Sequence, residues 1–273
     1  MVRKNRHPDF SCEEIDMERY FSLSQEYLRV PCRIYEPDFG APRRCILGVH
    51  GFGSSKDTEI LASLSEEMSL FGAATLCFDF PAHGENPLGS DALTLQNCID
   101  TLLYAAQWAH NRYPDADFCV YASGFGAYIT LIAIDQLEEL VGKVKLVLHT
   151  PNLRMSETLQ NMLRMNDEQL LEAGHATLNA PRKLEITYDF YKQLRNYTAL
   201  TIYDMPMLLL HGEKDEYLPV DDMINFRRIN EGCRLVMVPG ADHQFTTPGA
   251  WDMVVDLTRD WFECEQVVLC DWM

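Results

Sequence analysis

The sequence predicts an α/β protein with a mostly parallel sheet that is covered by helices on both faces. Short apolar runs alternate along the chain with longer segments whose apolar residues recur at helical spacing. Strands separated in this way favour parallel pairing, because a parallel crossover needs about a dozen residues. With 273 residues the chain can bury a substantial core. We therefore expect a single domain over residues 1–273.

Eight strands are predicted from the apolar runs. The first two, residues 20–23 and 27–35, follow each other closely and are expected to form an antiparallel entry to the sheet. The other six are expected over residues 44–49, 73–80, 118–122, 144–149, 207–210 and 234–238. Helical spacing predicts helices over residues 58–71, 93–111, 125–137, 221–229 and 251–264. Their apolar stripes are interpreted as faces that pack on the sheet.

Residues 151–201 interrupt this alternation. The segment is rich in methionine, aromatic and charged residues and lacks the periodicity of a strand. It follows the strand predicted over residues 144–149, and parallel sheets bind ligands outside the carboxyl ends of their strands. We expect it to form a small cap or lid over those ends. The alternative is a long helical connection that touches no ligand.

Composition argues against several classes of function. The chain has 41 acidic and 23 basic residues, and its net charge of −18 disfavours binding to nucleic acid or to an anionic membrane. No apolar run approaches the roughly 18 residues of a membrane span. The basic residues near the start are followed at residues 11–14 by polar sequence, where a signal peptide would have its apolar stretch.

The nine cysteines are scattered without a C-x-x-C pair. Four of them lie within predicted strands, where a reduced thiol behaves as a small apolar side chain: Cys45, Cys77, Cys119 and Cys233. This pattern predicts a reducing, cytoplasmic location. A zinc site would need ligands clustered at recognisable spacing, and none are found, so we expect neither a metal nor a cofactor.

The turn after the strand at residues 118–122 carries the most informative motif. A nucleophile elbow, written G-x-S-x-G, exposes a serine between a strand and a helix, with small residues two positions before and after it. Taking Ala122 and Gly126 as the small flanks places Gly124 at the nucleophile position. Centring the motif on Ser123 would place two aromatic residues at the flanks, which is sterically poor. Ser123 is therefore kept as the alternative nucleophile.

Three further strand ends carry residue types that acyl transfer requires. His50-Gly51-Phe52-Gly53 follows a strand, and its glycines let a backbone N–H point at a developing oxyanion. Asp215 comes soon after the strand at residues 207–210, and His243 follows the last strand. Each is a modest signal alone. Their joint placement at strand ends, in the order elbow, acid and histidine, predicts one site.

With these motifs, residues 40–265 resemble the α/β-hydrolase superfamily and, within it, bacterial feruloyl and cinnamoyl esterases and related small serine esterases. The matching stretches are residues 50–52, 78–84, 122–126, 211–215 and 240–243. The resemblance implies an α/β-hydrolase fold, a Ser-His-Asp triad and a cap that recognises the acyl or aromatic part of a small ester. It also implies an oxyanion hole from the backbone of Phe52 and Phe125, with Asp215 as the acid and His243 as the base.

The chain departs from this family at the attacking atom. Gly124 occupies the nucleophile position, and glycine cannot attack a carbonyl. Loss of a triad nucleophile lowers turnover by roughly 10⁶-fold, leaving about 10³ to 10⁴ over water. The open interpretations are an esterase whose serine has been replaced, a pseudo-hydrolase that binds an acyl or aromatic ligand, and attack by Ser123 from a shifted elbow. A serine aminopeptidase-like hydrolase is a further alternative, because a triad does not distinguish esters from amides.

Four other residues are weighed for roles at the site. Asp79 and His83 are interpreted as parts of a rigid, hydrogen-bonded loop beside the pocket. His149 ends a predicted strand and is a candidate for lining the cleft. His175 lies within the predicted cap and is a candidate for approaching the ligand.

Overall fold

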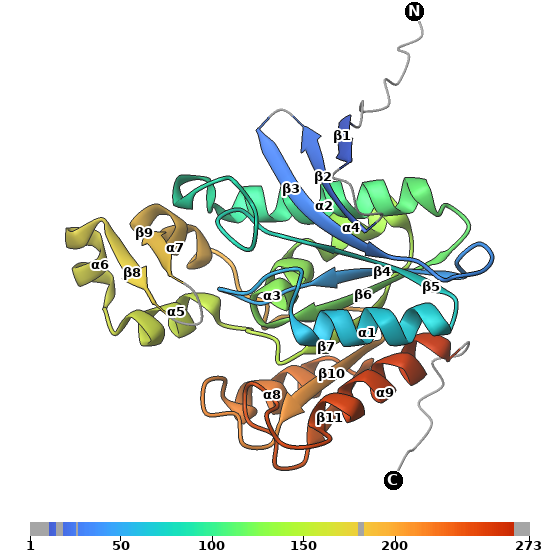
Figure 1. Cartoon of the computed structure of the whole chain (residues 1–273). Coiled ribbons are helices and arrows are strands. Elements are labelled where there is room, and N and C mark those ends of the chain that lie inside the picture. Colours follow the sequence, from blue (N-terminus) through green and yellow to red (C-terminus); the bar gives the residue numbers. More distant parts are fainter. Residues whose placement is uncertain (1–10, 15–18, 26, 180–182, 265–273) are drawn as a thin grey trace, which may run out of the picture.

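The computed structural model describes residues 11–14, 19–25, 27–179 and 183–264 (Figure 1). Both ends of the predicted 1–273 domain and residues 180–182 of the predicted cap lie outside these ranges. Nine strands form one sheet in the order β1-β2-β3-β5-β4-β6-β7-β10-β11. Their bounds are β1 Ser11–Glu14, β2 Tyr20–Gln25, β3 Leu28–Tyr35, β4 Arg44–Val49, β5 Ala73–Phe78, β6 Asp117–Ser123, β7 Lys145–His149, β10 Met207–Gly212 and β11 Cys233–Val238.

All eight predicted strands are present, and the predicted fold class is confirmed. From β5 to β11 every neighbouring pair is parallel. The predicted antiparallel entry is also present, since β2 pairs with β3 and β3 with β5 in antiparallel register. The short β1 adds an antiparallel edge strand that the sequence did not predict. Its residues, Ser-Cys-Glu-Glu, offer no apolar alternation.

Helices cover both faces of the sheet. On one face lie α1 (Glu59–Leu70) and α9 (Ala250–Glu263), whose apolar residues pack in one core cluster. On the other lie α2 (Leu95–Arg112), α3 (Gly124–Ile132), α4 (Ile134–Val141) and α8 (Val220–Ile229). The prediction of a single helix over residues 125–137 is wrong. Ala133 leaves the helical conformation, with φ −105° and ψ 7°, and so divides this region into α3 and α4.

Within the segment between β7 and β10 we call residues 151–201 the insertion, and its buried apolar residues belong to the same core cluster as α2, α3 and α4. It contains α5 (Met155–Leu163), α6 (Asp167–Ala173), β8 (His175–Leu178), β9 (Leu184–Thr187) and α7 (Tyr188–Leu194). Figure 1 shows it beyond the end of the sheet to which the arrows of β4 and β6 point. Although the sequence of this segment lacks strand periodicity, it contains two strands, β8 and β9, which form an antiparallel pair. Four-residue strands are too short to show clear alternation.

Two composition-based expectations can be compared with the described residues. Cys45, Cys77, Cys119 and Cys233 are buried free thiols in β4, β5, β6 and β11, as predicted. No helix in the described part of the chain is long and apolar enough to cross a membrane.

Candidate functional site

The turn from β6 into α3 has a left-handed residue, Gly124, at its centre. Gly124 opens α3 with φ of +50°, a region that side chains disfavour. A Cβ added at Gly126 would lie 2.5 Å from the carbonyl oxygen of His50, so only glycine fits at this flank. Ala122 is fully buried in β6. A left-handed centre between two small flanks is what an elbow centred on Gly124 requires.

The Ser123 side chain is directed toward β4 and not toward His243. Its backbone is extended, with φ −114° and ψ 144°. Its Oγ donates to the carbonyl oxygen of Val49 on β4 at 3.4 Å. Within the described residues, no hydrogen bond joins Ser123 to His243. The hydroxyl therefore lies against the neighbouring strand, and this geometry does not favour the shifted elbow.

The structure brings Asp215 and His243 together. Asp215 Oδ2 lies 2.8 Å from His243 Nδ1, so the two side chains are hydrogen-bonded. Asp215 Oδ1 accepts from the N–H groups of Tyr217, at 2.8 Å, and Leu218, at 2.9 Å. The carboxylate is fully buried, whereas the His243 side chain is 33 % exposed. Because Nδ1 is held by the acid, Nε2 is the nitrogen that can exchange a proton with a ligand.

Electrostatics keep this carboxylate ionised. Burial raises the pKa of Asp215, but the hydrogen bond and charge of His243 and the N–H groups of Leu218 and Tyr217 outweigh it. The pKa is held below its usual range. An ionised Asp215 can orient the imidazole and stabilise its protonated form.

Backbone packing explains why these two loops meet. Asp215 lies in the turn after β10, and His243 lies in the loop after the adjacent strand, β11. A Cβ at Gly212 would lie 2.6 Å from the carbonyl oxygen of Ala241. The Lys214 N–H also donates to that carbonyl at 2.8 Å. Glycine at the end of β10 thus lets the two loops touch, which places the acid beside the histidine.

The loop after β4 is oriented by His50. The Phe80 N–H donates to His50 Nε2 at 3.2 Å, so the ring hydrogen is on Nδ1, which donates to the Gly51 carbonyl at 2.7 Å. The Gly51 carbonyl and the Phe52 N–H belong to one planar trans peptide and point in opposite directions. Fixing the carbonyl therefore fixes the direction of the N–H that is predicted to bind an oxyanion.

The second predicted oxyanion donor is the Phe125 N–H. It lies in the first turn of α3, where backbone N–H groups have no acceptor within the helix. The rings of Phe52 and Phe125 are in edge contact, with centroids 5.2 Å apart. The structure therefore places both predicted donors on adjacent segments.

The insertion is hydrogen-bonded to the turn between β6 and α3. The Asn152 N–H donates to the Gly124 carbonyl at 3.1 Å. Phe190 of α7 is stacked parallel to Phe52, with ring centroids 6.2 Å apart and an interplanar angle of 5°. It also meets Phe125 at 6.3 Å. The insertion thus packs a buried aromatic side chain against the two phenylalanines beside the elbow.

Comparison with solved structures shows which fold this is. Est1E from Butyrivibrio proteoclasticus, in a structure with ferulic acid bound, is similar with a TM-score of 0.75 and 17 % identity, over 86 % of this chain and 94 % of that chain. The chain has the α/β-hydrolase fold. Alpha/beta hydrolase domain-containing protein 10 from mouse gives a TM-score of 0.69 and 17 % identity, over 93 % and 98 % of the two chains. The esterase domain of a Rhodothermus marinus protein gives 0.63 and 19 %, over 86 % and 92 %. No protein-family model and no curated protein sequence matches the chain.

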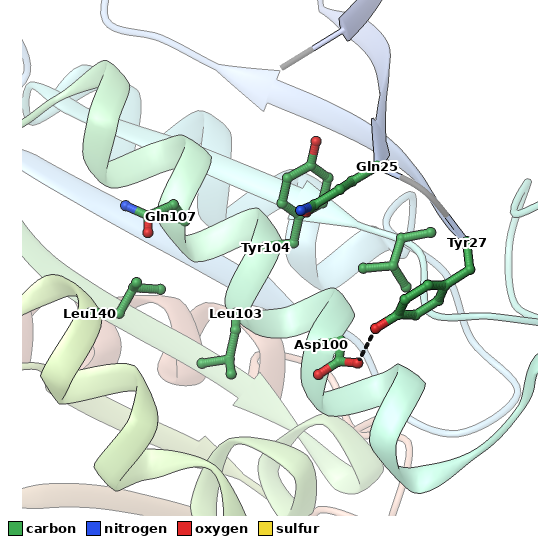
Figure 2. Close-up of a pocket in the computed structure, with 8 residues that line it drawn as sticks. Gln25, Tyr27, Asp100, Leu103, Tyr104, Gln107 and Leu140 are labelled. Carbon is green, nitrogen blue, oxygen red and sulfur yellow. Dashed lines mark hydrogen bonds between the residues drawn. The ribbon is translucent and has the colours of Figure 1, made fainter. Parts of the chain in front are cut away.

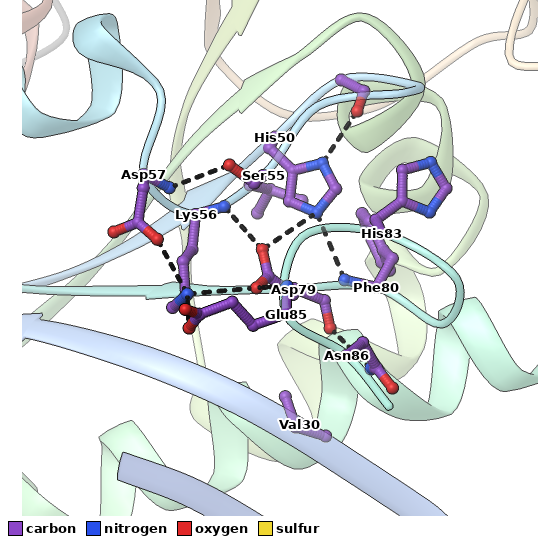
Figure 3. Close-up of polar contacts among 12 residues, drawn as sticks. Val30, His50, Ser55, Lys56, Asp57, Asp79, Phe80, His83, Glu85 and Asn86 are labelled. Atoms are coloured by element: carbon purple, nitrogen blue, oxygen red, sulfur yellow. Dashed lines mark hydrogen bonds and ion pairs between the residues drawn. The ribbon is translucent and has the colours of Figure 1, made fainter. Parts of the chain in front are cut away.

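On this α/β-hydrolase fold, Asp79 belongs to a buried polar cluster (Figure 3). Its Oδ1 accepts from the Lys56 N–H at 2.7 Å, and its Oδ2 from the Glu85 N–H at 2.9 Å and from Lys56 Nζ at 3.2 Å. His83 is also buried, and its Nδ1 lies 2.8 Å from the Pro81 carbonyl. The interpretation of Asp79 and His83 as parts of a hydrogen-bonded loop is confirmed. Lys56 was missed, because a lysine in a glycine- and serine-rich loop has the sequence pattern of a solvated residue.

The other two candidate histidines lie in different places: His149 of β7 is paired with Ser123 at the start of the elbow turn, whereas His175 lies in the insertion. His149 is buried, with Nδ1 2.8 Å from the Tyr121 hydroxyl and its ring in edge contact with Phe245 at 4.5 Å. It packs inside the molecule and is 4 % exposed, so the structure does not support His149 as a candidate for lining the cleft. His175 is exposed at the start of β8, opposite Thr187 of β9. Within the described residues, no contact joins His175 to Asp215 or His243.

A cavity of about 320 Å³ lies elsewhere on the α/β-hydrolase fold (Figure 2). It is lined by Gln25, Tyr27, Leu28, Asp100, Leu103, Tyr104, Gln107 and Leu140. The Tyr27 hydroxyl donates to Asp100 at 2.7 Å, and the lining includes no histidine, serine or cysteine. This cavity contains none of Gly124, Asp215 and His243, so the elbow remains the candidate site. Across the described ranges, no group of three or more His, Cys, Asp or Glu residues could hold a metal ion.

Proposed function

We propose that this chain is a protein of the carboxylic-ester hydrolase type that resembles feruloyl esterases. Gly124 occupies its nucleophile position. The observation that carries the proposal is the oriented pair of Asp215 and His243, joined at 2.8 Å, on a fold whose elbow centre at Gly124 has φ of +50°. The ligand is a small acyl or aromatic ester. We further propose that the protein is cytoplasmic and uses neither a metal nor a cofactor. The net charge of the chain, −18, argues against nucleic-acid or membrane partners.

The same geometry defines what a serine at position 124 would do. His243 would take the hydroxyl proton as Oγ attacks the ester carbonyl, while Asp215 holds the imidazole. The N–H groups of Phe52 and Phe125 would bind the oxyanion. With glycine at position 124 no acyl-serine can form there, so serine-type turnover is absent.

The insertion is proposed to act as a cap that recognises the acyl or aromatic part of the ligand. The support is its attachment through Asn152 to the Gly124 carbonyl and the stacking of Phe190 on Phe52. Aromatic side chains provide large contact area to a planar ligand. A cap joined to the elbow is well placed to couple ligand recognition to chemistry.

The test is to restore the nucleophile. Gly124→Ser should hydrolyse short-chain nitrophenyl esters or methyl hydroxycinnamates, and adding His243→Ala should remove that activity. Intact-protein and peptide mass spectrometry after acid quenching should show the acyl group on the serine introduced at position 124. A folded Gly124→Ser protein that stays at the background rate on esters and on aminoacyl nitroanilides would contradict the proposal. Loss of activity from the parent chain on Ser123→Ala would instead support the shifted elbow.

A binding protein is the second candidate, and the glycine itself favours it. Such a protein would hold an acyl or aromatic ligand without hydrolysing it. Calorimetric binding of ferulic acid or its methyl ester, together with an inactive but folded Gly124→Ser variant, would support this alternative.

A further inference from the structure

We propose that the chain, with Gly124 in place, hydrolyses activated acyl substrates by direct attack of water, with His243 as general base. The substrates are aryl esters and thioesters, whose leaving groups are stable anions. The inference rests on the proposed function and uses the same site. It differs in that no covalent intermediate forms.

The first observation is the room beside Gly124. A Cβ added at this residue would have Gly51 Cα, at 3.6 Å, as its nearest neighbour, which is ordinary van der Waals contact. The contrast is Gly126, where the added atom would lie 2.5 Å from a backbone carbonyl. The Cβ position at residue 124 is therefore open, and we place the attacking water on this side of Gly124.

The second observation is the oriented base. The buried Asp215 holds His243 Nδ1, while the imidazole is 33 % exposed. Burying a carboxylate costs free energy unless it is paired and hydrogen-bonded, and Asp215 receives three such bonds. The protein therefore maintains an imidazole whose Nε2 is available to accept a proton from water.

The reaction balances without any other reactant. Water gives one proton to His243 Nε2 while its oxygen forms a bond to the acyl carbon. The carbonyl electron pair moves to oxygen, where the Phe52 and Phe125 N–H groups bind the charge. When the pair returns, the bond to the phenol or thiol breaks, and the leaving group takes the proton from His243. The products are a carboxylic acid and a phenol or thiol, with no oxidation or reduction.

The experiment compares hydrolysis of p-nitrophenyl acetate and an acetyl thioester by four proteins: the chain itself, His243→Gln, Gly124→Ala and His110→Gln. His243→Gln should lower the rate above buffer by about 10²-fold or more, the usual contribution of a general base. Gly124→Ala should lower it at least about tenfold, because its methyl group displaces the attacking water. His110 contacts Phe118 near the amino end of β6, so His110→Gln is the matched control and should keep the parent rate.

Acid-quenched mass spectra separate the mechanisms. The parent should carry no acyl group during turnover, whereas Gly124→Ser should carry one. The inference is overturned if His243→Gln or Gly124→Ala, shown folded by circular dichroism, keeps the parent rate. An acyl adduct on Ser123 or on the exposed Cys264 would also overturn it. An inactive parent beside an active Gly124→Ser variant removes this inference and leaves the proposed function standing, whereas inactivity of both removes both.

Discussion

Two carboxylates follow strands at the same end of the sheet, and each has a histidine nearby. Asp79 follows β5, and His50 Nε2 lies 3.9 Å from its Oδ1. Asp215 follows β10, and His243 Nδ1 lies 2.8 Å from its Oδ2. Both carboxylates are fully buried, but His50 is also fully buried whereas His243 is 33 % exposed. The two clusters use similar residues in different environments.

The difference lies in where the imidazole nitrogens are used. Both nitrogens of His50 bond to backbone groups, at Phe80 and Gly51, so this ring fixes a loop. His243 uses one nitrogen on Asp215 and keeps an exposed edge. Burial raises the pKa of Asp79, and its bonds from the Glu85 N–H and from Lys56 offset this only in part. A carboxylate beside a histidine is therefore a candidate site only when the ring can also reach a ligand.

The largest expected effect separates the two carboxylates by activity. In the Gly124→Ser background, Asp215→Asn should lower kcat for nitrophenyl acetate by about 10⁴-fold, because the amide stabilises the wrong imidazole tautomer. Circular dichroism should show the fold unchanged. A variant within tenfold of Gly124→Ser would show that Asp215 does not orient His243 in catalysis.

The second expected effect concerns stability, at the Asp79 cluster. Lys56 Nζ lies 3.2 Å from Asp79, 2.8 Å from Asp57 and 2.7 Å from Glu85. Lys56→Met leaves the buried Asp79 without its cation and should lower the free energy of unfolding in urea by about 3–5 kcal/mol. Lys183→Met, which removes an exposed lysine 3.8 Å from Glu185, is the control and should change it by less than about 0.5 kcal/mol. Equal changes in the free energy of unfolding for Lys56→Met and Lys183→Met would mean that the Asp79 cluster does not stabilise the fold.

The third expected effect is a pH dependence of the free energy of unfolding that comes from His149. This histidine is buried, like His50, but the charges of His243 and Asp215 act on it. Burial, followed by the charges of His243 and His211, lowers the pKa of His149 to about 3. An unfolded histidine has a pKa of about 6.5, so between these values the unfolded chain binds more protons. The contribution of neutral His149 to the free energy of unfolding is fully present above pH 6.5 and is lost as the pH falls toward 3.

This contribution can be measured by urea unfolding at pH 7.5 and 5.0. His149 should account for about 2 kcal/mol of the loss in unfolding free energy between these pH values, since each pH unit below 6.5 corresponds to about 1.4 kcal/mol. His149→Gln should reduce the loss by that amount. An identical loss in the parent and in the variant would show that His149 is not held neutral.

The comparison also shows what the sequence could predict. Apolar runs identify the strands because burial in a parallel sheet requires them, and small flanks identify the elbow because its backbones touch. Lys56 could not be found in this way. Its burial depends on carboxylates supplied by Asp79 and Glu85, which lie 23 and 29 residues further along the chain. The break at Ala133 and the four-residue strands β8 and β9 were missed for a similar reason, since tertiary packing decides them over weak local signals.

The smallest expected effect tests whether the elbow is strained at Gly124. A non-glycine residue in such a conformation costs on the order of 1–3 kcal/mol, and the stiffer unfolded chain returns about 0.4–1 kcal/mol. Gly124→Ser should therefore lower the free energy of unfolding by about 1 kcal/mol, and the melting temperature by about 2–4 °C, while creating activity. Gly40→Ser is the matched control, because Gly40 has φ of +81° and no heavy atom within 4 Å of an added Cβ. Its loss should be similar, since both changes act through backbone conformation and not through a clash. A Gly124→Ser protein that melts at or above the parent temperature, while Gly40→Ser melts below it, would show that the turn is unstrained at Gly124 and would remove the elbow assignment on which the contrast with Asp79 depends.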